Sequence, residues 1–167
     1  MFAVRPAEQR DAEGAVDVVR RSITASCAAD HRGDSDTLAR WLANKTVRHF
    51  VSWLANEDNY CVVAEAHGSP ESHRSLLGVG LLQRSGQIIL FYLAPNAQRQ
   101  GIGKAIHAAL EEKARIWGLP KLSLDSTLLA CPFYERLGYR AAGAARPRFG
   151  VLCSYPYEKT LQTSERD

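Results

Sequence analysis

The sequence predicts an α/β fold in which helices cover both faces of a mostly antiparallel sheet. Residues 60–65, 75–82 and 87–93 are strand-like runs separated by short turns, which is typical of an antiparallel meander. The first of these turns, residues 68–73, is rich in turn-forming side chains and is expected to be a hairpin loop. The third run is apolar on both faces, as expected of a central strand covered on each side. Amphipathic segments before and after the meander supply the helices. With the strands expected toward the end of the chain, the sheet has six or seven strands.

The segments before the meander have helical periodicity. Asp11 is a plausible N-cap, and apolar residues recur at spacings of three and four from Ala12 to Ile23. Shorter helices are expected around residues 38–42 and 47–54, where apolar side chains again share one face.

The segments after the meander alternate between helix and strand. The clearest helix is expected at residues 101–117, where a glycine and a proline then terminate it. A short strand is expected at 122–125, a short helix at 132–137, and closing strands from Tyr139 onward and at 151–161.

Composition and charge indicate one soluble domain that spans residues 1–167. The chain has 167 residues, of which 46% are hydrophobic and 23% charged. Its longest apolar run, residues 88–94, is far shorter than the about 20 residues that cross a bilayer, and early charged residues argue against a signal peptide. We therefore expect a cytoplasmic protein without a membrane partner. The 21 basic and 18 acidic residues give a net charge of +3, which is too small and too scattered to indicate nucleic-acid binding.

The four cysteines do not form a recognisable metal or redox motif. Cys27, Cys61, Cys131 and Cys153 include no C-x-x-C pair, which disfavours a zinc ribbon or a thioredoxin-type site. We expect free thiols in a reducing compartment and no metal cofactor.

A glycine-containing turn, residues 93–104, joins the most buried strand to the clearest helix. Gly101 and Gly103 allow the backbone to approach a ligand closely. Backbone N–H groups at the positive end of a helix form an anion site, and Arg99 and Lys104 add charge beside it. The alternative is that the two glycines only permit tight packing of the helix on the sheet.

Two common phosphate-binding motifs do not fit this turn. A Walker A loop requires a glycine at the position of Gln98 and a serine or threonine at that of Ala105. A dinucleotide fingerprint requires a third glycine where Ile106 stands, and it requires βαβ connections where hairpins are predicted. The pattern that does fit is Gln98-x-x-Gly101-x-Gly103.

This pattern resembles the coenzyme A loop of the Gcn5-related N-acetyltransferase (GNAT) superfamily. Upstream, residues 91–95 look like the fourth strand of that family with its trailing proline. Downstream, residues 132–139 are similar to its FYE-x-x-G-[FY] signature. Residues 4–11 and 157–159 also match the family, so the resemblance covers essentially the whole chain.

The resemblance implies acetyl-CoA as co-substrate and a backbone-assisted reaction. The backbone N–H at or near Leu93 would hold the acetyl carbonyl oxygen, and Tyr134 would act as general acid toward the thioester sulfur. The alternative for Tyr134 is a packing role beside Phe133. The residues expected to contact the coenzyme are Leu93, Gln98, Arg99, Gln100, Gly101, Ile102, Gly103, Lys104 and Ser126.

Two departures from the family leave parts of the site open. Many members carry a glutamate on the fourth strand, whereas residues 87–93 contain no carboxylate. Asp125, His49, His31 or a chain of waters would then serve as general base. Leu129 stands where relatives often have a polar residue that contacts the pantetheine arm.

Other residues near the expected thioester complete this picture. Ser126 or Thr127 would supply the contact missing at Leu129. Cys131 is expected near the thioester, in a structural role.

The acceptor is the least determined part of the predicted site. Family acceptor sites use the loop between the first helices, here residues 28–36, whose three acids would attract a cationic amine or simply cap helices in a solvated loop. Phe50, Trp53 and Tyr60 would line an acceptor pocket or fill the core.

Two functions remain open on the sequence. The first is an N-acetyltransferase that acts on a primary amine of a small molecule or peptide. The second is a non-catalytic coenzyme A-binding regulatory module. Dimers are common on this fold, so a homodimer is a possible assembly.

Overall fold

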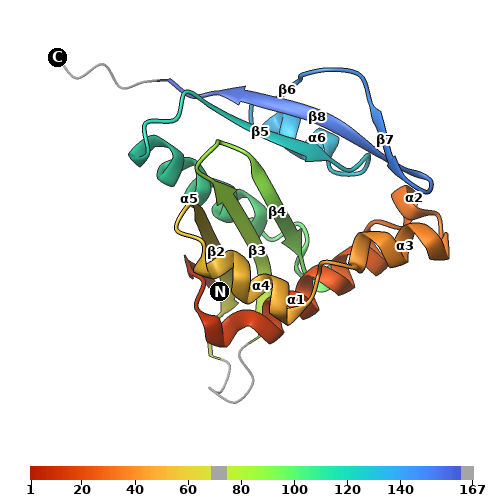
Figure 1. Cartoon of the computed structure of the whole chain (residues 1–167). Helices are drawn as coiled ribbons and strands as arrows, with labels where there is room; N and C mark the ends of the chain where they lie inside the picture. The colour runs from red at the N-terminus through yellow and green to blue at the C-terminus, as the bar shows by residue number, and fades with distance from the viewer. Residues whose placement is uncertain (69–74, 163–167) are drawn as a thin grey trace.

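In the computed structural model, which describes residues 1–68 and 75–162, the chain forms two antiparallel sheets that diverge from each other (Figure 1). The first sheet has the order β1-β2-β3-β4 and contains the predicted meander. Its strands are β1 (Phe2–Pro6), β2 (Asn59–Ala66), β3 (Leu76–Gln83) and β4 (Ile88–Leu93). Residues 69–74 of the expected hairpin loop lie outside the described residues.

The second sheet is built around a long C-terminal strand. The strand β8 (Leu152–Thr160) pairs with β5 (Lys121–Ser126), with the two-residue β6 (Arg140–Ala141) and with β7 (Arg146–Phe149). The predicted α/β class with antiparallel strands is confirmed. The described residues contain eight strand segments, slightly more than expected, because β1 was not predicted and the closing region divides into short pieces.

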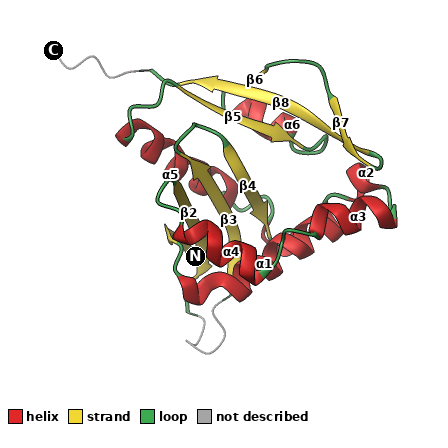
Figure 2. Ribbon diagram, in the orientation of Figure 1, coloured by secondary structure: helices red, strands yellow, loops and turns green. Residues whose placement is uncertain are grey.

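Helices lie on both faces of the first sheet, and a further short helix lies beside the second sheet, as Figure 2 shows. Before the meander, α1 (Ala12–Arg21) continues through a π-helical turn (Ser22–Ser26) to α2 (Ala28–His31), α3 (Ser35–Leu42) and α4 (Val47–Ala55). After it come α5 (Ile102–Ile116) and α6 (Cys131–Arg136). The predicted helices are all present, and their ends differ from the expected ends by a few residues. No described helix has both the length and the apolar character needed to cross a membrane.

Close packing on β3 fixes the position of α5. A Cβ atom on Gly78 or on Gly80 would lie 2.6 Å from the side chain of Ile106, so only glycine lets the helix approach this closely. Both Ile106 and Leu110 are fully buried there. Because the N-terminus of α5 is thereby held beside the end of β4, the fold itself sets where the glycine-containing turn lies.

Asp11 occupies the N-cap position of α1 as expected, but its side chain accepts no hydrogen bond from the first turn of that helix. Its carboxylate forms an ion pair with Arg5 of β1 at 2.8 Å and accepts a hydrogen bond from the Glu8 N–H at 2.8 Å. These partners hold the pKa of the buried carboxyl below its ordinary value, against the effect of burial. Asp11 therefore ties the N-terminal strand to the start of α1.

Candidate active site

The strands β4 and β5 meet at one end and separate at the other. Gln87, just before β4, forms a parallel bridge with Ser123 of β5, and the Ser123 N–H donates to the Gly86 carbonyl at 2.9 Å. Beyond this point β4 is the edge of its sheet (Figure 1). The Ala94 N–H donates to Leu77 of β3 at 2.8 Å. Since successive N–H groups of a strand alternate between its edges, the Leu93 N–H points toward the gap.

The turn between β4 and α5 has an unusual backbone. It begins as a short 3₁₀ helix at Pro95–Ala97, and Arg99 then has φ 61° and Gly101 φ 79°, both in the left-handed region. The Gln100 side chain donates to the Asn96 carbonyl at 3.0 Å and closes the turn on itself. Glycine adopts this region without the steric cost that a side chain such as that of Arg99 brings, which explains Gly101.

The N-terminus of α5 is available to an anion. Gly101 is the N-cap of α5 and has no side chain that could accept a hydrogen bond from an N–H of the first turn. The first helical hydrogen bond runs from the Ala105 N–H to the Gly101 carbonyl at 3.1 Å. The amides of residues 102–104 therefore lack an intrahelical partner. Arg99 and Lys104 are exposed and form no ion pair with a described residue. Free amides and unpaired cations at a helix N-terminus suit a pyrophosphate group.

Gly103 has a different role from Gly101. A Cβ atom at Gly103 would lie 3.1 Å from the ring of Phe133 in α6 and 3.5 Å from Leu93. Tight packing therefore explains Gly103, whereas backbone conformation explains Gly101. The packing interpretation therefore applies to Gly103, whereas close approach of a ligand to this turn stays a prediction.

Tyr134 lies in an aromatic cluster between α6 and β4. It is 6% exposed, and its ring makes edge-on contacts with Phe91, Phe133 and Tyr139 at centroid distances of 5.8, 5.3 and 5.5 Å. Its hydroxyl takes part in no hydrogen bond among the described residues. Burial raises the pKa of Tyr134 well above its ordinary value. The hydroxyl is therefore protonated at neutral pH and able to donate.

Residues at the end of β5 are close to the same gap. The buried Ser126 hydroxyl donates to the Thr127 carbonyl at 2.7 Å, and the Cys131 thiol approaches the same carbonyl at 3.2 Å. Leu129 is 60% exposed. Leu129 lies in the loop before α6 and offers no polar group. The polar side chains nearest the end of β5 are those of Ser126 and Thr127.

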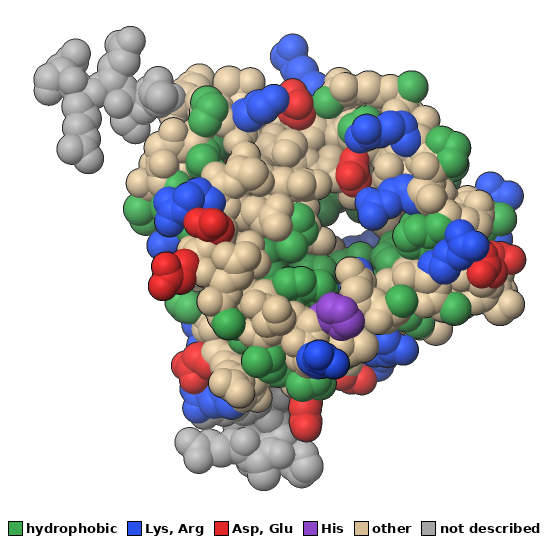
Figure 3. Space-filling view, viewed as in Figure 1, with side chains coloured by type: hydrophobic (Ala, Val, Ile, Leu, Met, Phe, Trp, Pro, Cys, Tyr) green, Lys and Arg blue, Asp and Glu red, His purple; other side chains and the backbone are tan. Residues whose placement is uncertain are grey.

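A cavity of about 560 Å³ occupies the opening between the sheets. Its walls come from the end of α3 and the turn after it, from α4, from β4 and β5, and from the β7–β8 hairpin. Its aromatic side chains are Trp41, Trp53, Tyr92 and Phe149. Ser126 lines it, whereas Leu93 and Tyr134 do not. Figure 3 shows the hollow on this face, with hydrophobic side chains inside and Lys and Arg side chains around it.

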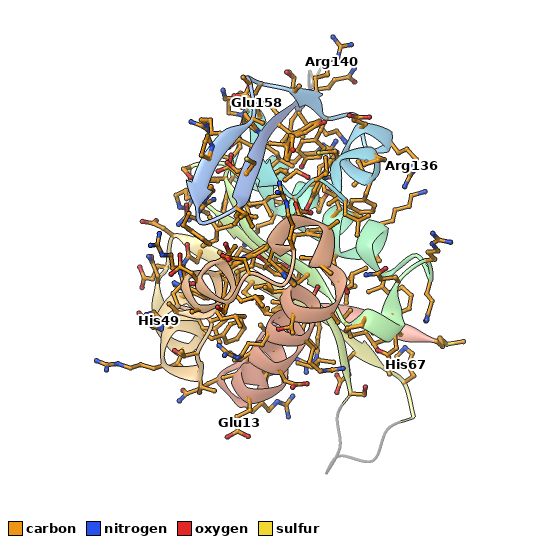
Figure 4. The ribbon with its side chains drawn as sticks, turned by 90° about the vertical axis from the view of Figure 1, so that its right-hand side faces the viewer. Glu13, His49, His67, Arg136, Arg140 and Glu158 are labelled. Atoms are coloured by element: carbon orange, nitrogen blue, oxygen red, sulfur yellow. The ribbon has the colours of Figure 1, made fainter. Side chains whose placement is uncertain are left out.

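The three candidates for general base lie in different environments. Both ring nitrogens of the buried His31 are engaged, one with the Thr24 carbonyl at 3.0 Å and the other with the Gly33 N–H at 2.9 Å. His49 is exposed on α4 and is paired with Thr46 at 2.6 Å (Figure 4). Asp125 lines the cavity. Of the three, Asp125 is therefore the one placed beside a bound acceptor, and its carboxylate also lies 3.6 Å from Arg146 and 3.7 Å from Arg148.

The acids of residues 28–36 do not form the cationic-amine site that was one of the two expectations. Asp30 is buried and accepts from the Leu128 N–H at 2.8 Å, although its other oxygen has no partner among the described residues. Asp34 caps α3 through Thr37, and Asp36 pairs with Arg40 at 3.2 Å. The capping interpretation therefore holds for Asp34, whereas Asp30 is buried and Asp36 forms an ion pair.

The three aromatic residues considered for the acceptor pocket lie in different parts of the structure. Phe50 is fully buried in the core, and Tyr60 packs edge-on against Trp117 at 6.4 Å. Only Trp53 of the three lines the cavity.

Several cavity residues were not predicted from the sequence. Lys45 and Arg148 supply cations, while Trp41 donates to the Tyr92 hydroxyl at 3.3 Å. They come from four separate elements, and no local motif joins them. Among the described residues, no cluster of three or more His, Cys, Asp or Glu side chains could hold a metal ion.

Comparison with known proteins agrees with this geometry. A family model described as an acetyltransferase (GNAT) domain matches residues 27–161. The chain therefore belongs to the GNAT family of acetyltransferases. None of the curated protein sequences matches it.

Solved structures support the same fold. The GCN5-related N-acetyltransferase from Rhodopseudomonas palustris matches with a TM-score of 0.81 and 22% identity, over 95% of each chain. The PaiA N-acetyltransferase from Thermoplasma acidophilum, solved in complex with coenzyme A, matches with a TM-score of 0.75 and 17% identity, over 96% of this chain and 99% of that one. The ribosomal-protein-S18-alanine N-acetyltransferase from Escherichia coli gives 0.70 and 16%, over 100% and 99%. At these identities the likeness concerns the fold.

Proposed function

We propose that this protein is an acetyl-CoA-dependent N-acetyltransferase that transfers the acetyl group directly to a primary amine of a small molecule or peptide. The observation that carries the proposal is the separation of β4 from β5 directly beside the uncapped N-terminus of α5. It leaves an edge-strand N–H, an anion site and a protonated tyrosine around one gap. A cavity whose lining includes Tyr92 of β4 and Ser126 of β5 lies beside these groups.

The turn before α5 would hold the coenzyme. The amides from Arg99 to Lys104 would bind its pyrophosphate, with the two side chains adding positive charge. Gln98 and Gln100 flank this site, and Ser126 would contact the arm that reaches toward the gap. When bound, acetyl-CoA supplies the acetyl group as a thioester.

The Leu93 N–H would stabilise the charge that develops on the acetyl oxygen. It is a backbone donor on an edge strand, so it is fixed in place before the reaction begins. Losing one such donor typically lowers the rate about 10²–10³-fold. Because it is a backbone group, no ordinary side-chain substitution removes it.

Tyr134 would donate its proton toward the departing sulfur. A free thiol has a pKa of about 8.5 and a free phenol one of about 10, and burial widens this difference by raising the pKa of Tyr134. Tyr134 would therefore act first as a hydrogen-bond donor to the developing thiolate. Because the raised pKa opposes full transfer of the phenol proton, the sulfur would leave as a thiolate stabilised by this hydrogen bond.

The acceptor amine must lose a proton before it attacks. Asp125 is the carboxylate that lines the cavity, so it would take this proton directly or through water. A cavity of about 560 Å³ lies within the size range of small-molecule sites, about 300–1,000 Å³, which favours a small acceptor over a long peptide. The expected cytoplasmic location and homodimer remain predictions.

The proposal is tested by release of free thiol from acetyl-CoA with a pooled library of primary amines. We expect thiol release that depends on both the protein and an amine pool, together with acetyl-CoA binding measured by calorimetry. Binding of acetyl-CoA without amine-dependent thiol release would instead favour the non-catalytic coenzyme A-binding module. Absence of both would contradict the coenzyme site itself.

A further inference from the structure

The cavity between the sheets carries an excess of positive charge. Its lining contains Arg40, Lys45 and Arg148 but one acidic side chain, Asp125. Arg40 is balanced by Asp36 at 3.2 Å. The charges that remain are those of Lys45 and Arg148 against a single carboxylate.

Lys45 has no acidic partner among the described residues. Its ammonium group donates to the Asn44 side-chain oxygen at 2.5 Å and forms no ion pair. Burial, together with the nearby charge of Arg148, lowers the pKa of Lys45 to about 8. A partly buried cation beside a second cation is costly, and a bound anion would relieve that cost.

Arg148 is only loosely neutralised. Its guanidinium lies 3.7 Å from the Asp125 carboxylate, which is also shared with Arg146 at 3.6 Å. Two arginines therefore compete for one carboxylate at a distance near the limit of an ion pair. The planar guanidinium of Arg148 has donors left for a second anion.

The backbone holds Lys45 in place. Its N–H donates to the Leu42 carbonyl at 3.0 Å, and the Arg20 guanidinium donates to the carbonyls of Leu42 and Lys45, each at 3.0 Å. On the opposite wall, the Val151 N–H donates to the Thr37 hydroxyl at 3.0 Å and fastens the β7–β8 hairpin to α3. The two cations therefore belong to fixed walls.

From these contacts we infer that the acceptor is a small amine that also carries an anionic group, as amino acids do, and that Lys45 and Arg148 bind this group. The inference rests on the proposed function. The apolar part of the acceptor would lie against Trp41 and Trp53, and its amine would face Asp125. Polycationic amines would be rejected, because the two cations of the cavity repel them.

Matched pairs of amines test the inference. Thiol release from acetyl-CoA is measured with the common amino acids and with their amides, with phosphoethanolamine and ethanolamine, and with spermidine. We expect turnover with one or more anionic members and a kcat/KM at least about 10-fold lower for the neutral partner of each active compound. The carboxylate and phosphate arms identify which anion is bound. Preference for neutral amines or for spermidine would overturn the inference.

A charge-removing variant assigns the effect to Lys45. Lys45→Gln is expected to raise KM for the anionic acceptor about 10–100-fold, while KM for its neutral partner and for acetyl-CoA stays unchanged. Lys121→Gln removes the same charge from the outer surface, where Lys121 pairs with Glu158, and is expected to leave all three values unchanged. Equal KM changes for the anionic and neutral acceptors would contradict the assignment.

A binding measurement separates this inference from the proposed function. Calorimetry is performed with N-acetyl amino acids and N-acetyl amino acid amides, which need no turnover. If no amine is acetylated but the N-acetyl amino acids bind and Lys45→Gln abolishes that binding, the reaction fails and the anion site stands. If neither set binds and no anionic amine is acetylated, the anion site is overturned.

Discussion

At the scale of single residues, burial decides which chemistry a side chain can perform. Tyr134 could be identified from the FYE signature, but the sequence could not show that its ring is enclosed by Phe91, Phe133 and Tyr139. That enclosure raises the pKa of the hydroxyl and leaves it without a hydrogen-bond partner in the part of the chain that the structure describes. The side chain is thus kept as a neutral donor at the end of β4.

Tyr134→Phe tests this role directly. Removal of the hydroxyl is expected to lower kcat about 10²–10⁴-fold, because the departing sulfur loses its proton donor. Acetyl-CoA binding should be nearly unchanged, since the ring and its packing remain. Steady-state thiol release and calorimetric binding are the two measurements. An unchanged kcat would remove Tyr134 from the mechanism.

Residues that act together but come from different elements were not predictable. Lys45, Arg148 and Trp41 have no shared motif, and only the folded chain brings them to one cavity. In contrast, the acids Asp34 and Asp36 could be interpreted in two ways, and local contacts decided the outcome, since Asp34 caps α3 and Asp36 pairs with Arg40. Spacing along the sequence does not show which charged side chains from distant segments, such as Lys45 and Arg148, come together in the fold.

At the scale of elements, the turn between β4 and α5 shows how far a motif can be interpreted. The pattern Gln98-x-x-Gly101-x-Gly103 predicted an anion site at a helix N-terminus, and the helix begins there. It did not predict that Gly101 is required for a left-handed backbone conformation, whereas Gly103 is required for close contact with Phe133. The difference depends on α6, which lies 30 residues further along the chain.

Substitutions at Gly101 separate backbone strain from side-chain contact. Nothing lies within 4 Å of a Cβ atom built at Gly101, so Gly101→Ala costs only the left-handed conformation, about 1–2 kcal/mol of unfolding free energy. Gly101→Asn should cost less, because asparagine enters this region more readily. Urea unfolding of the two variants gives the values. Equal losses, or none, would contradict a left-handed Gly101.

At the scale of the whole molecule, the fold class was predictable and its division into two sheets was not. Short turns between apolar runs predicted the meander, in which neighbouring strands are close in sequence. In contrast, β1 pairs with β2 across more than 50 residues of intervening chain. Its side chains are half-buried, so it lacks the strong pattern of β4. The split between β4 and β5 is a property of pairing, which a single sequence does not display.

Stability in mild acid should depend on one buried histidine. His107 is enclosed by α5 and Tyr139, and its ring bonds to the Tyr139 hydroxyl at 2.8 Å. Burial lowers the pKa of His107 to about 4 in spite of nearby Glu111. The unfolded chain, with a histidine pKa near 6.5, binds the proton first, so unfolding free energy falls as pH decreases from about 6.5 to about 4. At about 1.4 kcal/mol per pH unit, the loss is about 3 kcal/mol.

The pH series needs two variants. His107→Gln should flatten the slope of unfolding free energy between about pH 6.5 and pH 4, whatever its effect on absolute stability. His49→Gln, which removes an exposed histidine, should keep the slope. Persistence of the slope in His107→Gln would show that other groups cause it.

The central claim is direct transfer of an acetyl group from acetyl-CoA to an amine. The most direct measurement follows a labelled acetyl group in the presence of an amine that supports thiol release. We expect the label in a hydroxylamine-resistant amide of that amine, with one free thiol formed per amide and none of the label on the protein. Label retained on the protein as a hydroxylamine-sensitive thioester, as at Cys131, or label that never leaves acetyl-CoA, would contradict the account.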